Sequence, residues 1–532
     1  MDRINKKEEL LQRAMQEARE GDLKKAIKLL KHLDRIDPND IENKLRLGAV
    51  YHQANQERSA LEALELFVKK KPNALFAFQL MGRVFYKLKK YDDSLIAFNK
   101  EIENNPEYAE AYSDRAYVLN ELNRFDQALD SASKAIGLDQ NLPEAFDCMA
   151  IAHNALRHFN DAKKYVFKAI ELDGSNPDFI RTLADIRFDQ GDSVEALEIY
   201  DIVLKHQPKN SHCILQKSIL LLQMTQFKEG WQLYEERHFI SEKKSLYQQF
   251  SGNDFIKHPH MLIKKEQGIG DMVLFMSTLS ELDEVEQVAR DKEIIVEIDP
   301  RLVSIFERSF KHLKFITNTK LLDNRKLYKT FGIASLGGYL RKHISLFKNQ
   351  KQQFLSSDIN KTKSYRDYLD SLKSNKEIKI CGISWRSQNP KLGFFKSVEL
   401  IKLKSILSLE NILFVNLQYD CSSQEIIEIK QKYGFDIINF PDIDLLNDID
   451  SACSLISACD MILTTSNINV HLAGAQGKDV FLLVPKGKGR HFYWHHGYKK
   501  SLWYPSVTIF DQDEPGDWTV PIDQVLKELS LK

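Results

Sequence analysis

The sequence has no net charge, because 75 Lys and Arg residues balance 75 Asp and Glu residues in a chain of 532. A neutral chain offers no general attraction for nucleic acid or for an anionic membrane, so we expect neither as a partner. The sequence also lacks a run of about 18 apolar residues, the length that spans a membrane. Its first twenty residues lack the apolar core of a signal peptide. These absences favour a cytoplasmic protein with no membrane span.

Cysteine is scarce as well. The six cysteines form no CxxC pair, so neither a disulfide framework nor a zinc knuckle is indicated. His491 and His495 have the i, i+4 spacing of two zinc ligands, but no adjacent glutamate completes a metalloprotease motif. We therefore expect no metal site and no cofactor.

The first half of the chain repeats with a period of 34 residues. One series of small residues recurs at this interval: Ala26, Ala60, Ser94, Ala128, Ala162, Ala196 and Gly230. A second small series comprises Gly48, Gly82, Ala116, Ala150 and Ala184. Small residues allow two helices to cross closely, and prolines such as Pro38 and Pro72 end the second helix. The period predicts seven helical hairpins.

This pattern resembles the tetratricopeptide repeat over about residues 7 to 244, and we assign residues 1–244 to the array. The resemblance implies an α-solenoid whose concave surface binds an extended peptide of a protein acceptor. The alternatives are a spacer and an arm for homo-oligomer formation. No asparagine ladder of the kind found in protein O-GlcNAc transferases repeats along the expected groove, so the mode of acceptor recognition stays open.

Beyond residue 250 short apolar runs replace the helical period. They include 261–266, 293–298, 314–317, 378–385, 412–418, 461–465 and 480–485. Continuous runs rich in Val, Ile and Leu are typical of parallel strands covered on both faces. A charged stretch at 356–377 divides the region. We predict two Rossmann-like α/β halves, 245–370 and 371–532, with a cleft at the carboxyl ends of their strands.

Two segments at predicted strand ends have polar residues suited to a ligand. In the first half, Gln267, Gly268, Gly270 and Asp271 form a turn before a helix; an ordinary turn capped by an aspartate is the alternative. In the second half a helix start favours an anion such as a diphosphate. An N-capped helix with a core histidine is the alternative there. The residues of this second segment are Thr465, Ser466, Asn467, His471, Leu472 and Ala473.

The motifs of this region resemble those of the heptosyltransferase-like glycosyltransferases with the GT-B fold. They are EQGIGD (266–271), GISWRS (382–387), KS (396–397), VNLQY (415–419), HLAGAQG (471–477), LWYPS (502–506) and GDW (516–518). The whole chain is similar to bacterial tetratricopeptide-repeat glycosyltransferases, which include flagellin glycosyltransferases.

The resemblance implies transfer of a sugar from a nucleotide-sugar substrate to a protein, for which flagellin is one candidate. It makes Asp271 the general base and places Lys396 on the donor phosphate. No Asp-x-Asp motif lies at a cleft-placed strand end, since Asp442 and Asp444 read as a loop, so the resemblance implies metal-independent transfer. A noncatalytic adaptor with a nucleotide-binding or decayed α/β region is the alternative, and transfer to a lipid-linked or free glycan is another.

Three further features have two interpretations each. Gln418 ends a strand and either holds the donor or is a surface amide. Trp385 either stacks on a base or packs between the halves, and Arg386 beside it suits an anion. A cluster of cations has two interpretations: it attracts an anion, which is the donor phosphate or an acidic sugar, or it forms a basic surface loop. This cluster comprises Lys486, Lys488, Arg490, Lys499 and Lys500.

Overall fold

The computed structural model describes residues 2–237, 258–282, 293–311, 313–322, 328–420 and 423–531. The chain divides into two compact units, Met1–Ile186 and Arg187–Lys532. The division falls inside helix α11 (Pro177–Gln190), so the last helices of the array belong to the second unit. Across the described ranges, no helix combines the length and apolar character that crossing a bilayer requires.

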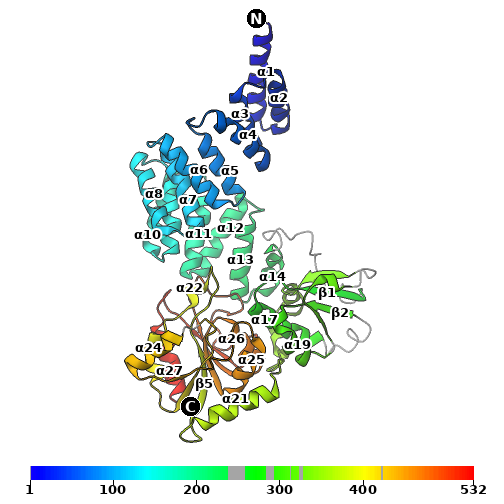
Figure 1. Ribbon diagram of the computed structural model, residues 1–532, viewed down its shortest axis with the longest axis vertical. Coiled ribbons are helices and arrows are strands. Elements are labelled where there is room, and N and C mark those ends of the chain that lie inside the picture. Colours follow the sequence, from blue (N-terminus) through cyan, green and yellow to red (C-terminus); the bar gives the residue numbers. More distant parts are fainter. Residues whose placement is uncertain are drawn as a thin grey trace. The chain divides into compact units, whose positions relative to one another are not determined.

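The first unit consists of helical hairpins, as the period of 34 predicts (Figure 1). The small residues explain how closely the helices pack. A Cβ on Gly48 would lie 2.6 Å from Leu64 Cγ, and one on Gly82 would lie 2.6 Å from Phe98 Cε1. The helices are α1 (Asp2–Arg19), α2 (Leu23–Ile36), α3 (Ile41–Gln53), α4 (Glu57–Lys70), α5 (Ala77–Lys87), α6 (Tyr91–Asn104), α7 (Ala109–Glu121), α8 (Phe125–Leu138), α9 (Pro143–Ala155) and α10 (Phe159–Leu172).

The turn inside each hairpin has a residue with a left-handed backbone conformation. These residues also recur every 34 positions: Gly21, Asn55, Lys89, Asn123, Arg157, Gly191 and Thr225. The left-handed region costs an ordinary L-residue about 1 kcal/mol, so the repeat geometry overrides local preference at these turns.

The second unit begins with the end of α11, which is followed by α12 (Ser193–His206), α13 (Ser211–Gln223) and α14 (Phe227–Tyr234). Its first lobe has a parallel sheet in the order β3-β2-β1-β4, in which Met261 pairs with Ile294 on one side and with Lys329 on the other. The strands are β1 (His260–Lys264), β2 (Glu293–Glu297), β3 (Lys314–Ile316) and β4 (Lys329–Gly332); the helices include α17 (Ile269–Leu282), α19 (Val303–Ser309) and α20 (Ser335–Leu340).

The second lobe has a larger parallel sheet in the order β10-β9-β8-β5-β6-β7. Its strands are β5 (Lys379–Ser384), β6 (Ile412–Asn416), β7 (Ile437–Ile438), β8 (Met461–Thr465), β9 (Asp479–Val484) and β10 (Val507–Asp511). Its helices are α22 (Gly393–Lys396), α23 (Lys404–Leu407), α24 (Ser423–Tyr433), α25 (Ile449–Ala458), α26 (Ile468–Ala475) and α27 (Thr519–Leu529). The α-solenoid followed by two parallel α/β lobes confirms the predicted fold class.

One apolar core joins α14 to both lobes. Trp231, Phe275, Val470 and Trp494 belong to the same buried cluster. The charged stretch between the predicted halves forms α21 (Ile359–Ser371), which packs against α25.

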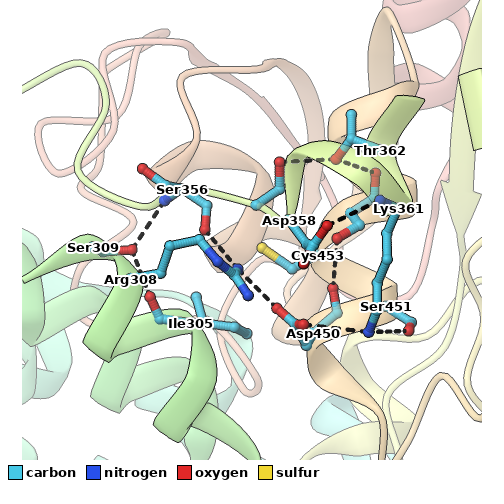
Figure 2. Close-up of polar contacts among 12 residues, drawn as sticks. Ile305, Arg308, Ser309, Ser356, Asp358, Lys361, Thr362, Asp450, Ser451 and Cys453 are labelled. Carbon is cyan, nitrogen blue, oxygen red and sulfur yellow. Dashed lines mark hydrogen bonds and ion pairs between the residues drawn. The ribbon is translucent and has the colours of Figure 1, made fainter. Parts of the chain in front are cut away.

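Ion pairs also hold the lobes together beside α21. Arg308 on α19 of the first lobe donates to Asp450 Oδ1 of α25 at 2.9 Å, and Lys361 approaches Asp450 Oδ2 at 3.3 Å (Figure 2). A single carboxylate therefore connects the first lobe, α21 and the second lobe.

Candidate functional site

A cavity of about 290 Å³ lies between the two lobes. Its lining follows several strand ends: 268–271 comes after β1, 387–389 after β5, Tyr419 after β6 and 466–468 after β8. Parallel sheets bind ligands at this edge because the loops there converge. The volume is at the small end for ligand pockets, and it suits the reacting part of a larger molecule.

Asp271 enters the cavity from the first turn of α17. The Tyr493 hydroxyl donates a hydrogen bond to its Oδ1 at 3.1 Å. Burial raises the pKa of the Asp271 carboxyl from its ordinary value, while the Tyr493 hydrogen bond and the Lys396 charge oppose that rise. The result is a carboxylate of increased basicity at a helix N-terminus.

The surroundings of Gly270 explain why a glycine directly precedes Asp271. A Cβ at this position would lie 2.7 Å from His471 Cδ2 on α26. The two lobes therefore approach each other at this glycine, and the turn is more than a local cap.

The N-terminus of α26 forms the opposite wall. Asn467 caps the helix by accepting from the Asn469 backbone at 2.9 Å, and its Nδ2 donates to Ser384 Oγ at 3.1 Å. His471 Nδ1 lies 3.1 Å from the Tyr504 hydroxyl. Burial lowers the pKa of His471 to about 3, so its ring is neutral and provides a hydrogen bond without a charge.

Lys396 is the cation at the end of α22. Its Nζ donates to His491 Nε2 at 3.0 Å, and only 4% of the residue is exposed. Burial lowers the pKa of Lys396 to about 8, whereas the pKa of His491 falls well below its usual range. At neutral pH most Lys396 side chains are charged and His491 is a neutral acceptor.

The structure thus brings seven predicted residues to one cavity: Gly268, Gly270, Asp271, Lys396, Ser466, Asn467 and His471. Among the described residues, the lining of this cavity leaves out five others, namely Gln267, Gln418, Thr465, Leu472 and Ala473.

Gln418 has a structural contact instead of a cavity position. Its Oε1 accepts from the backbone of Trp385 at 2.9 Å and of Arg386 at 2.8 Å. Trp385 is fully buried in the core of the second lobe, not between the halves. Arg386 pairs with Glu425 at 2.8 Å. Gln418 is therefore buried, at 2% exposure, instead of being a surface amide, and Trp385 packs inside the second lobe instead of between the halves; both interpretations are corrected.

The basic cluster also differs from its interpretation as a phosphate-attracting patch. Lys488 pairs with Asp189 at 2.8 Å and the buried Arg490 pairs with Asp511 at 2.7 Å. Within the described ranges, the five cations are missing from the cavity lining. Lys488 and Arg490 therefore hold protein segments together instead of facing the cavity.

Arg301, His491 and Tyr493 are three of the lining residues that the sequence-based site assignment did not include. Arg301 follows β2 and is held by Asp299, with Nε to Oδ1 at 2.9 Å. His491 was considered only for its zinc-ligand spacing with His495, and Tyr493 was not considered as a site residue, although both line the cavity. Its position after the end of a predicted strand is the sequence signal that could have identified Arg301 as a candidate.

The array also matches known families. Residues 17–84 and 80–143 each match a family model described as tetratricopeptide repeat. The N-terminal region is a tetratricopeptide-repeat solenoid. A curated relative, Protein FlbA of Caulobacter vibrioides (strain ATCC 19089 / CIP 103742 / CB 15), is 26% identical over 332 residues. The match covers 59% of this chain and 54% of the relative, so the chain spans about half of that protein's length.

Two solved structures are similar to part of this chain. A crystal structure of MamA is 25% identical, with a TM-score of 0.28, and the match covers 30% of this chain and 94% of that one. A tetratricopeptide repeat protein from Parabacteroides merdae ATCC 43184 is 16% identical, with a TM-score of 0.40, over 45% of this chain and 94% of that one.

Proposed function

We propose that the chain is a GT-B glycosyltransferase that moves a sugar from a nucleotide-activated donor to a protein acceptor held by the repeats. The observation that supports this best is the convergence of Asp271 from one lobe with Lys396 and His471 from the other on one cavity. An acid-base group and an anion-binding helix end then face each other across the space that a sugar occupies.

The first lobe supplies the base. The hydroxyl proton of the acceptor passes to Asp271 as the acceptor oxygen forms its bond to the anomeric carbon. The raised pKa of Asp271 strengthens it as a proton acceptor. The Tyr493 hydroxyl and the backbone of Gly268 hold the carboxylate in place for the acceptor.

The second lobe supplies the stabilising charge. The bond between the anomeric carbon and the phosphate oxygen breaks, and its electron pair leaves with the nucleotide. The Lys396 ammonium and the free backbone N–H groups of α26 stabilise the negative charge on that phosphate. The neutral His471 ring adds a hydrogen bond. This charge arrangement suits transfer without a metal ion.

The repeats hold the acceptor protein. A tetratricopeptide-repeat solenoid presents an extended surface to a peptide, and flagellin is one candidate. Acceptor capture raises the local concentration of the hydroxyl at the cavity.

Transfer by the full-length chain tests the proposal. The protein is incubated with flagellin and with UDP-, GDP-, ADP- or CMP-sugars, and the acceptor mass is measured. We expect a mass increase with one donor class and a loss of about 10²-fold or more in Asp271→Asn, because the proton acceptor is removed. Asp442→Asn, in an exposed loop, is the matched control.

Normal transfer by Asp271→Asn refutes the assigned base. Flagellin binding without transfer from any of the four donors favours the noncatalytic adaptor instead.

A further inference from the structure

The loop that contains Lys486, Lys488 and Arg490 connects two parts of the second unit. We call residues 486–497 the coupling loop; it follows β9 and carries His491 and Tyr493 into the cavity. It also contacts the last helices of the array.

The first of these contacts is with the C-terminal end of α11. Lys488 Nζ donates to Asp189 Oδ2 at 2.8 Å, and the Lys488 backbone donates to the Asp189 carbonyl at 3.1 Å. Gly487 has φ +66°, and a Cβ there would lie 2.1 Å from the Asp189 carbonyl oxygen. Both side chain and backbone therefore fix the loop on this helix end.

The second contact is with the C-terminal end of α13. The Gln223 amide donates to the Arg490 carbonyl at 3.1 Å, and the His496 backbone donates to the Gln223 carbonyl at 3.0 Å. His495 Nδ1 lies 2.9 Å from the Leu222 carbonyl oxygen. The loop thus binds two successive hairpins through buried polar groups.

The same loop positions the site. His491 accepts from Lys396 at 3.0 Å, Tyr493 donates to Asp271 at 3.1 Å, and Trp494 Nε1 donates to Ser466 at 2.8 Å. Lys488 also lies 5.1 Å from the ring centre of Phe395, the neighbour of Lys396.

We infer that the coupling loop links the end of the array to the cavity, and that Lys488 and Asp189 are positioning residues for Lys396 and Asp271. A movement of α11 or α13 displaces His491 and Tyr493, because the coupling loop is hydrogen-bonded both to these two helices and to the residues of the cavity. Acceptor binding in the array is therefore transmitted to the catalytic geometry through this segment. The kinetic part of this inference rests on the proposed function; the structural part does not.

The structural part is measured on Lys396 itself. The full-length protein is treated with an amine-acylating reagent across a pH series, and Lys396 acylation is quantified by mass spectrometry. The groups that face Lys396 are Asp271 from α17, His471 from α26 and His491 from the loop. In Lys488→Met we expect the Lys396 pKa to rise by about one unit, because a displaced loop admits water around the ammonium.

The variants distinguish positioning from general damage. Asp189→Asn breaks the same ion pair from the array side, and the exchanged pair Asp189→Lys with Lys488→Asp restores the charge match. We expect the exchanged pair to recover at least half of the shift. Lys499→Met removes a cation that pairs with Glu528, away from the array helices, and leaves the Lys396 profile unchanged.

Turnover is the second readout. We expect about a tenfold loss of kcat in Lys488→Met with little change in the donor KM, because a misplaced catalytic group slows chemistry more than binding. An unchanged Lys396 profile in both folded single variants, or an equal change in Lys499→Met, overturns the inference. A shifted profile in a chain without transfer activity supports the coupling and refutes only the proposed function.

Discussion

Replacing Gly270 by alanine tests whether the glycine turn sets the approach of the two lobes. The added Cβ would lie 2.7 Å from His471 Cδ2 and 3.1 Å from Nε2. His471 has little freedom to move away, since it is bonded to Tyr504, stacks on Trp494 at 5.8 Å between ring centres and is 3% exposed. Either α17 or the imidazole must shift.

Overpacking of this kind costs about 1 to 3 kcal/mol. Because about 1.4 kcal/mol corresponds to a factor of ten, the folding equilibrium should weaken by about 5- to 150-fold. The first tryptophan in the chain is Trp231, so tryptophan fluorescence during urea unfolding reports on the second unit.

Gly268→Ala is the matched control. Its Cβ would meet Asp271 Oδ2 at 3.5 Å, an ordinary contact, and the substitution is the same one two residues earlier. We expect its unfolding free energy to stay within about 0.5 kcal/mol of the parent. Equal destabilisation by the two alanines, or none by Gly270→Ala, refutes the argument that Gly270 is required by His471.

Three further outcomes are expected. In Tyr493→Phe, loss of a hydrogen bond to the Asp271 carboxylate raises its pKa further, so the acid limb of the pH-rate profile moves to higher pH; an unmoved limb contradicts the contact. Arg308→Met should lower the unfolding free energy of the second unit by about 1 kcal/mol by breaking the pair with Asp450, and no change in urea unfolding contradicts a role in joining the lobes. Burial raises the pKa of Asp147 from 3.8 to about 6, so the carboxyl ionises at lower pH in the unfolded chain and stability is lost as the pH rises from about 4 to about 6. Asp147→Asn should therefore stabilise the array by up to about 3 kcal/mol at neutral pH, but not below about pH 4, in thermal unfolding followed by circular dichroism.

The periodic parts of this fold were predictable because their physics is local. Small residues every 34 positions mark helix crossings, and the structure places Gly48 and Gly82 against side chains of the next helix. The apolar runs from 261 to 485 became strands for the same reason, since burial on both faces demands continuous apolar sequence. Strand β10 (Val507–Asp511) escaped prediction, because its apolar run is short and interrupted by Thr508.

The site was predictable where a residue is fixed by its own strand end. Asp271 and His471 each lie in the first turn of the helix that follows a buried strand, so topology brings them together. The roles of Lys488 and Gln418 were less accessible, because their partners are distant in the sequence. Lys488 meets Asp189 299 positions away, and Gln418 meets the Trp385 backbone 33 positions away. A sequence pattern of charges contains no information about such pairings.

The left-handed turns show another limit. Positions 55, 89, 123 and 157 share a backbone conformation but not a residue type, being Asn, Lys, Asn and Arg. Packing of the repeat imposes the conformation, so a search for glycine or asparagine finds only some of these turns.

Nucleotide binding at the cavity tests the central claim most directly. The full-length chain is titrated with UDP, GDP, ADP and CMP by calorimetry, alongside Lys396→Met and the control Lys499→Met. We expect one nucleotide to bind, with affinity reduced at least about tenfold in Lys396→Met, because a charged hydrogen bond to phosphate is lost, and unchanged in Lys499→Met. Failure of all four to bind, or equal binding by Lys396→Met, would contradict a donor-phosphate site in this cavity.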